Sequence, residues 1–245
     1  MREKGNRFLI SFLAMETSAV YAYRAQATMK DYPGRSCALF FTPGCNFRCG
    51  FCHNSSLFSV EGKYTWEKLG DILVKFKKQW INAATITGGE PTIHPELPET
   101  IQFFKKKGFL VKLDTNGSNP NMLETCLPLV DYVAMDIKCA FSRYQEITGY
   151  GNVDNLKRSV KMIMEQAKDY EFRTTVIEMY HDDADLVECA KSILGAKRYV
   201  LQPFVPHEEL PLEELRTKPR TRPSFLHHAA EVIAPYVPSV SIRGE

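Results

Sequence analysis

The chain has 245 residues, of which 44% are hydrophobic and 24% are charged, a balance typical of a globular protein with a sizeable core. Its formal net charge is only +2 at pH 7, so charge gives no reason to expect binding to nucleic acid or to an anionic membrane. The length is ordinary for one α/β domain.

Residues 1–30 are expected to form a variable N-terminal leader ahead of a single domain spanning 31–245. The stretch MREKGNRFLISFLAM joins basic residues to a short apolar run, a faint likeness to a signal peptide. Ser11 breaks the run and Glu16 closes it, and the chain has no stretch of the roughly 20 apolar residues that a transmembrane helix needs. A translation start at Met15 is an open alternative.

Strand-like and helical patterns alternate from residue 36 onward. Runs rich in Val, Ile and Phe predict strands at 37–42, 83–87, 109–115, 132–138, 171–177 and 198–204. Amphipathic patterns between them predict helices at 65–80, 96–107, 120–127, 153–168 and 183–194. A Pro-rich, charged loop at 205–223 precedes a last helix (224–234) and a last strand (239–244).

Strands separated by amphipathic helices indicate parallel βα units. Six units precede the tail, too few for an eightfold barrel, so an α/β fold is expected that forms a partial (β/α)6 barrel with a short C-terminal extension. No internal repeat or clear linker divides the chain, which favours one domain.

Polar or glycine-containing segments follow five of the expected strands. They are the stretch from Cys45 onward, Gly88-Gly89-Glu90, Asp114-Thr115-Asn116-Gly117, Asp136 with Lys138, and Gln202. Ligands of parallel α/β folds bind at the C-terminal ends of the strands, so these segments predict a binding site at that edge.

The segment TPGCNFRCGFCHNSS (42–56) holds three of the seven cysteines, Cys45, Cys49 and Cys52. The other four are scattered in mostly apolar surroundings and are expected to be ordinary buried thiols: Cys37, Cys126, Cys139 and Cys189. This is no secreted disulfide framework, so a reducing, cytoplasmic setting is expected.

Four kinds of site use close-set cysteines. Zinc would need His53 as its fourth ligand, but a ligand adjacent to Cys52 rarely reaches the same tetrahedral site. CGFCH matches the haem attachment pattern, which requires export and leaves Cys45 idle. Unpartnered or disulfide-linked thiols are disfavoured, because cysteines that bracket Gly44, Asn46 and Gly50 in a polar turn do not form a packed core. An iron–sulfur cluster fits best, because three thiolates on one loop leave one iron of a [4Fe–4S] cluster open.

The spacing C-x3-C-x2-C after the first strand, with Phe51 before the last cysteine, resembles the defining motif of the radical S-adenosylmethionine (SAM) superfamily. TGGEP (87–91) resembles its SAM-binding stretch. Further motifs resemble one subgroup, the activating proteins of anaerobic (class III) ribonucleoside-triphosphate reductase, relatives of pyruvate formate-lyase activating enzyme. Those motifs are DYPG (31–34), LDTNGSNP (113–120), DYVAMDIK (131–138), ITG (147–149), EFRTT (171–175), RYVLQPF (198–204) and the terminal SIRG.

The resemblance implies a mechanism and partners. Cys45, Cys49 and Cys52 would hold a [4Fe–4S] cluster, SAM would bind its open iron, and reductive cleavage of SAM would give a 5′-deoxyadenosyl radical. In activating enzymes that radical takes a hydrogen from a glycine of a partner. The implied partners are a glycyl-radical enzyme, namely class III ribonucleotide reductase, and an electron donor such as flavodoxin or ferredoxin.

The same resemblance assigns the residues of the SAM site. Gly88, Gly89 and Glu90, followed by Pro91, are implied to receive the amino group of SAM, since glycines permit close backbone approach. Lys138 is implied to pair with the SAM carboxylate.

The neighbouring strand ends complete the implied site. Asp114, Thr115 and Asn116 would face the ribose or methionine part of SAM. Asp114 and Asp136 are carboxylates on neighbouring strand ends, and in the related formate-lyase activase such a pair helps bind a monovalent cation.

Two later strand ends leave alternatives open. Arg173 and Gln202 are candidates for SAM contacts, but Arg173 could equally bridge the strand-end carboxylates and Gln202 could cap a loop. For the whole chain, a radical SAM enzyme acting on a small molecule or another macromolecule is the second functional hypothesis. A non-catalytic iron–sulfur or zinc protein is the third, and it would leave GGEP and the strand-end carboxylates unexplained.

Overall fold

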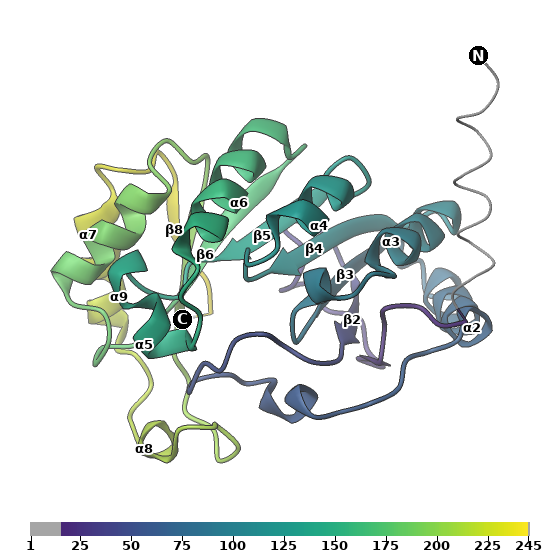
Figure 1. The fold of residues 1–245 in the computed structure, drawn as a ribbon, viewed down its shortest axis with the longest axis horizontal. Helices are drawn as coiled ribbons and strands as arrows, with labels where there is room; N and C mark the ends of the chain where they lie inside the picture. The colour runs from purple at the N-terminus through teal and green to yellow at the C-terminus, as the bar shows by residue number, and fades with distance from the viewer. Residues whose placement is uncertain (1–15, 245) are drawn as a thin grey trace.

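The computed structural model describes residues 16–244, which form an eight-stranded sheet with the strand order β1 to β8. Strands β2 to β8 run parallel to one another, and β1 pairs with β2 in the antiparallel direction. Each parallel crossover carries a helix, and the sheet is curved (Figure 1). The fold is therefore the partial βα barrel that the sequence predicts.

The strand bounds follow the predicted spacing. The strands are β1 (Ala22–Tyr23), β2 (Ala38–Thr42), β3 (Ala83–Gly88), β4 (Leu110–Thr115), β5 (Tyr132–Asp136), β6 (Tyr170–Val176), β7 (Tyr199–Pro203) and β8 (Val240–Ile242). The six predicted core strands correspond to β2–β7, and the predicted last strand corresponds to β8. The two-residue β1 was not predicted.

The six predicted helices are also present. They are α2 (Trp66–Lys78), α3 (Leu97–Lys106), α4 (Pro120–Cys126), α6 (Val153–Gln166), α7 (Asp183–Ser192) and α9 (Pro223–Ile233). The structure adds the short helices α5 (Tyr144–Thr148) and α8 (Glu213–Arg216), and three 3-10 turns, η1 (Ser55–Phe58), η2 (Pro91–Ile93) and η3 (Phe141–Arg143). Helix α8 lies inside the segment 205–223, which had been predicted as a loop.

Helix α2 shows why these segments are helical. The Thr65 side chain accepts a hydrogen bond from the backbone N–H of Lys68 and so caps the helix start. Ile72, Leu73 and Phe76 lie on one face and are buried against the sheet. Burial of each such side chain contributes about 1.5–3 kcal/mol, so the helix is stabilised mainly by this packing.

The two faces of the sheet differ in polarity. On β4, Val111 and Leu113 belong to the hydrophobic core, whereas Lys112 and Asp114 pair with each other. Because alternate residues of a strand point to opposite faces, one face packs against the helices and the other gives the barrel a charged interior. The candidate site lies at the open end of that interior.

Residues 16–30 pack against the sheet, although they fall within the predicted leader. Ala22 of β1 pairs with Phe41, and Ala19 and Val20 are fully buried in the core. We therefore propose that the domain includes residues 16–30. The rest of the predicted leader, including the alternative start at Met15, lies outside the described residues. No helix of the described residues is long and apolar enough to cross a membrane.

Candidate active site

A cavity of about 490 Å³ opens at the C-terminal ends of the parallel strands. It brings together nearly all the residues singled out in the sequence, although they come from separate segments. Its lining includes Cys45, Cys49, Cys52, Gly88, Gly89, Glu90, Asp114, Thr115, Asn116, Asp136, Lys138, Arg173 and Gln202. Pro91 is not in this lining and is buried at the start of η2.

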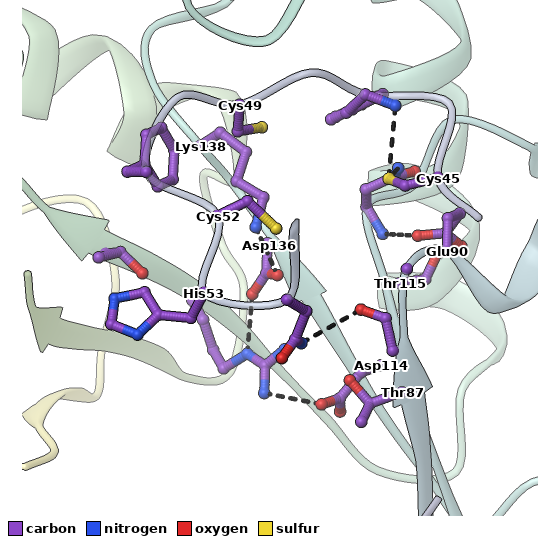
Figure 2. Close-up of a pocket in the computed structure, with 18 of the residues that line it drawn as sticks. Cys45, Cys49, Cys52, His53, Thr87, Glu90, Asp114, Thr115, Asp136 and Lys138 are labelled. Atoms are coloured by element: carbon purple, nitrogen blue, oxygen red, sulfur yellow. Dashed lines mark hydrogen bonds and ion pairs between the residues drawn. The ribbon is translucent and has the colours of Figure 1, made fainter. Parts of the chain in front are cut away.

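The three clustered cysteines carry free thiols that face the cavity. Figure 2 shows Cys49 and Cys52 on one side of it and Cys45 on the other. Burial raises the pKa of Cys45 to about 11 and that of Cys49 to about 12, although the nearby Lys138 ammonium opposes the shift. The thiols are therefore protonated unless a positively charged group such as iron binds them.

The end of β3 positions the start of the cysteine loop. The backbone N–H of Gly89 donates to the Thr42 carbonyl (3.0 Å), and that of Glu90 donates to the Gly44 carbonyl (2.9 Å). The contact is so close that a Cβ added to Gly89 would lie 1.6 Å from the Gly44 carbonyl oxygen. Glycine is thus required at position 89 by the backbone that leads into Cys45.

Glu90 ties β3 to β4. It is almost fully buried, and its Oε1 accepts hydrogen bonds from the Thr92 N–H (3.0 Å) and hydroxyl (2.5 Å) and from the Thr115 hydroxyl (2.7 Å). Its Oε2 accepts from the Asn116 N–H (2.6 Å). Burial raises the pKa of Glu90, and these hydrogen bonds oppose the rise. The family resemblance assigned Glu90 only to SAM binding. Its role in joining the ends of β3 and β4 was not visible in the sequence.

Asn46 is a further residue of the site that the sequence analysis did not single out. Its amide accepts a hydrogen bond from Asn116 (3.0 Å) and donates one to the Ser118 hydroxyl (2.8 Å). The Phe47 N–H donates to the Cys45 sulfur (3.4 Å). The position of Asn46 between two cysteines was the available signal, but its partner at residue 116 could not be found from spacing.

Charged side chains at the strand ends form a bridged network (Figure 2). Arg173 donates from Nε to Asp136 (2.9 Å) and from Nη1 to Asp114 (3.2 Å), and Lys138 donates to Asp136 (2.8 Å). Burial acts to raise the pKa of Asp136, but Arg173 and Lys138 outweigh it and hold that pKa well below its usual range. Arg173 therefore does bridge the carboxylates, one of the two roles considered from the sequence.

The segment 205–223, here called the covering segment, packs on the cysteine loop. The Leu212 N–H donates to the Gly50 carbonyl (3.1 Å), and the Ser55 hydroxyl donates to the Glu209 carbonyl (3.0 Å). The rings of His53 and His207 face each other with centroids 6.2 Å apart. The cysteine loop is thus held both by the end of β3 and by the covering segment.

This packing predicts a paired mutational effect. A Cβ at position 50 would lie 2.7 Å from the Leu212 Cβ, so Gly50→Ala is expected to cost about 1–3 kcal/mol of unfolding free energy through overpacking. In a Leu212→Gly background the clash is absent, and the same substitution is expected to cost less than about 0.5 kcal/mol. Denaturant unfolding of the four proteins of this cycle measures both values, and equal costs in the two backgrounds would contradict the contact.

A parallel partial barrel with three cysteines and a charged pocket at its open end defines a radical SAM enzyme. The profile of the Radical SAM superfamily matches residues 39–191. The chain belongs to this superfamily, whose members use a [4Fe–4S] cluster and SAM.

Among the relatives that are similar in sequence, two have names that refer to activating enzymes. The chain is 33% identical over 224 residues to a Methanocaldococcus jannaschii protein, MJ1227, provisionally named a glycyl-radical enzyme activating enzyme, covering 87% of this chain and 91% of the relative. It is 32% identical over 142 residues to pyruvate formate-lyase-activating enzyme of Clostridium pasteurianum, covering 54% of this chain and 59% of that enzyme.

A solved structure resembles the fold. Streptococcus suis SuiB bound to its precursor peptide SuiA superposes with a TM-score of 0.65 at 14% identity, covering 83% of this chain and 47% of SuiB. At this identity the likeness establishes the shared fold and nothing about the substrate.

The residues present fit the iron–sulfur cluster of the family. Three free thiols face one polar cavity, and the Phe47 N–H already points at one of the sulfurs, as hydrogen bonds to cluster ligands do. A zinc site would need a fourth ligand beside the three cysteines. Among residues 16–244, no group of three or more His, Cys, Asp and Glu side chains is already drawn together around a metal position, and this holds for Cys45, Cys49 and Cys52 as well.

Proposed function

We propose that this enzyme generates a glycyl radical on a partner enzyme, with class III ribonucleotide reductase as that partner. The observation that carries the proposal is the 33% identity, over 87% of the chain, to a protein provisionally named a glycyl-radical enzyme activating enzyme. The shorter match to pyruvate formate-lyase-activating enzyme supports the same class of reaction. The proposed setting is the cytoplasm, with flavodoxin or ferredoxin as the electron donor.

The geometry of the cavity supports the proposed roles of the residues. Cys45, Cys49 and Cys52 hold the cluster as thiolates, and Lys138 stabilises them because its positive charge lowers the pKa of each thiol against the effect of burial. With cluster and SAM bound, the cofactors supply a 5′-deoxyadenosyl radical. The protein binds and orients them.

The strand ends are proposed to hold SAM. Arg173 and Lys138 present positive charge toward the cavity, which suits the SAM carboxylate. The amino group of SAM would contact the backbone of Gly88 and Gly89 and the side chain of Glu90. Gln202, whose register partner on β6 is Thr175, lies across the cavity and is proposed to contact the nucleoside part.

The chemistry is tested first without a partner. After anaerobic reconstitution with iron and sulfide and reduction with dithionite, added SAM is expected to yield 5′-deoxyadenosine and methionine. The same mixture without dithionite is the control, because cleavage requires an electron. A sound cluster that yields neither product would contradict the radical SAM reaction.

The partner is tested next. Addition of a class III reductase to the reduced enzyme and SAM is expected to produce the doublet of a glycyl radical in electron paramagnetic resonance. SAM cleavage without any glycyl signal would instead favour the second hypothesis, a small-molecule or other macromolecular substrate.

A further inference from the structure

Lys112 lies inside the barrel and was not singled out in the sequence. It is on β4, two residues before Asp114, so both side chains point to the same face of the strand. The Lys112 side chain is fully buried, and its ammonium group donates to Asp114 Oδ1. A buried lysine is rare unless it is paired, so its position beside Asp114, which lines the cavity, calls for an explanation.

Every carboxylate oxygen of the strand-end pair has a cationic partner. For Asp114, Oδ1 accepts from Lys112 and Oδ2 accepts from Arg173. For Asp136, Oδ1 accepts from Arg173 and Oδ2 accepts from Lys138. The four oxygens that would otherwise be available to a bound cation are therefore already engaged by side chains.

The charge balance points the same way. Asp114 and Asp136 face three cationic side chains, and the neighbouring carboxylate of Glu171 is paired with Arg243, so a further cation would enter a site with an excess of positive charge and would be repelled at short range. Burial lowers the pKa of Lys112, and the Asp114 carboxylate opposes this shift. If the Lys112 ammonium gave its proton to Asp114, both side chains would be neutral. The net charge of the pair is zero in either case, so the excess of positive charge at the site does not change. The residues present thus do not fit the monovalent cation that the resemblance implied.

We infer that Lys112 takes the place of a monovalent cation at the Asp114–Asp136 pair, so that SAM binding in this enzyme requires neither Na⁺ nor K⁺. The inference rests on the SAM site of the proposed function. Lys112 acts as a positioning residue. Its ammonium group balances the negative charge of Asp114, and Asp114 in turn holds Arg173 at the cavity wall.

The test compares SAM binding in different salts. The dissociation constant for SAM is measured by equilibrium dialysis with the reconstituted protein in NaCl, KCl or tetramethylammonium chloride at equal ionic strength. The wild type is expected to vary by less than about twofold among them. Lys112→Ala removes the charge and opens space for an ion, so its SAM affinity is expected to be about tenfold weaker in tetramethylammonium than in Na⁺ or K⁺, because a charge-assisted contact is lost.

Lys112→Met is the matched control. It removes the same charge but fills the space, so its affinity for SAM is expected to be low in all three salts. If Lys112 had a merely structural role, both variants would bind SAM more weakly, and neither affinity would depend on the cation. A wild type that needs Na⁺ or K⁺ to bind SAM, or a folded Lys112→Ala variant that shows no cation dependence, would overturn the inference.

A second readout does not depend on SAM. Binding of Tl⁺, a spectroscopic substitute for K⁺, is followed by ²⁰⁵Tl NMR on the reconstituted proteins. We expect one saturable site in Lys112→Ala and none in the wild type, and a saturable site in the wild type would contradict the inference even if the variant does not fold. Failure of the wild type to bind SAM in every salt would count against the proposed function, while the Tl⁺ titration would still decide the role of Lys112.

Discussion

Gly89→Ala is expected to abolish stable cluster binding and to lower the rate of SAM cleavage on the order of a hundredfold or more. The reason is steric, because the new Cβ would lie 1.6 Å from the Gly44 carbonyl oxygen and 3.2 Å from the Cys45 nitrogen. The clash is with backbone atoms, which cannot rotate away as a side chain can. The cysteine loop must therefore shift, and Cys45 shifts with it. Iron and sulfide per chain after anaerobic reconstitution, together with 5′-deoxyadenosine formation, measure the effect.

Gly70→Ala is the matched control for this substitution. Gly70 lies inside α2, and an added Cβ would make an ordinary contact at 3.6 Å with Phe103. Because alanine is favoured over glycine in helices by about 1 kcal/mol, the variant should be at least as stable as the wild type and fully active. Full cluster content in Gly89→Ala would show that the cysteine loop does not depend on the end of β3.

Cys49→Ala is expected to remove the cluster and SAM cleavage together. Cys49 is buried beside the cavity and is one of the three cysteines that line it among residues 16–244, so its loss leaves two ligands for a cluster that needs three from the protein. The visible absorption of the reconstituted protein and its content of iron report the cluster directly. Cys49 also belongs to the hydrophobic core, so a small loss of stability is expected, and circular dichroism checks that the variant is folded.

Cys126→Ala serves as the control for a cysteine outside the site. Cys126 is fully buried at the end of α4 in the hydrophobic core, so its replacement should lower stability slightly and leave the cluster content unchanged. If Cys126→Ala lost the cluster and Cys49→Ala retained it, the assignment of the ligands would be wrong.

The parts of the fold set by local patterns could be predicted from the sequence. Strands β2–β7 and their helices follow from hydrophobic period and length, and the common edge of the site follows because parallel strands end on the same side. Cys45, Cys49 and Cys52 are close in sequence, so their shared role was visible in their spacing. The fold confirms the predicted strands, and the family match confirms the predicted superfamily.

Features that depend on contacts between distant segments could not be predicted. Strand β1 has two residues and exists only because β2 offers it an edge. Contact between Leu212 and Gly50 joins segments far apart in the chain, and no local pattern marks it. Lys112 was not singled out, because the barrel interior that buries it, and the Arg173 side chain that shares its partner Asp114, come together only when the sheet closes.

The central claim, that the enzyme takes hydrogen from a glycine of a partner, is tested most directly by isotope transfer. A class III reductase labelled with [2,2-²H₂]glycine is incubated anaerobically with the reduced enzyme and SAM, and the 5′-deoxyadenosine formed is analysed by mass spectrometry. We predict 5′-deoxyadenosine that carries one deuterium, in an amount matching the glycyl radical. Unlabelled 5′-deoxyadenosine formed in the presence of a competent, labelled reductase would contradict the claim.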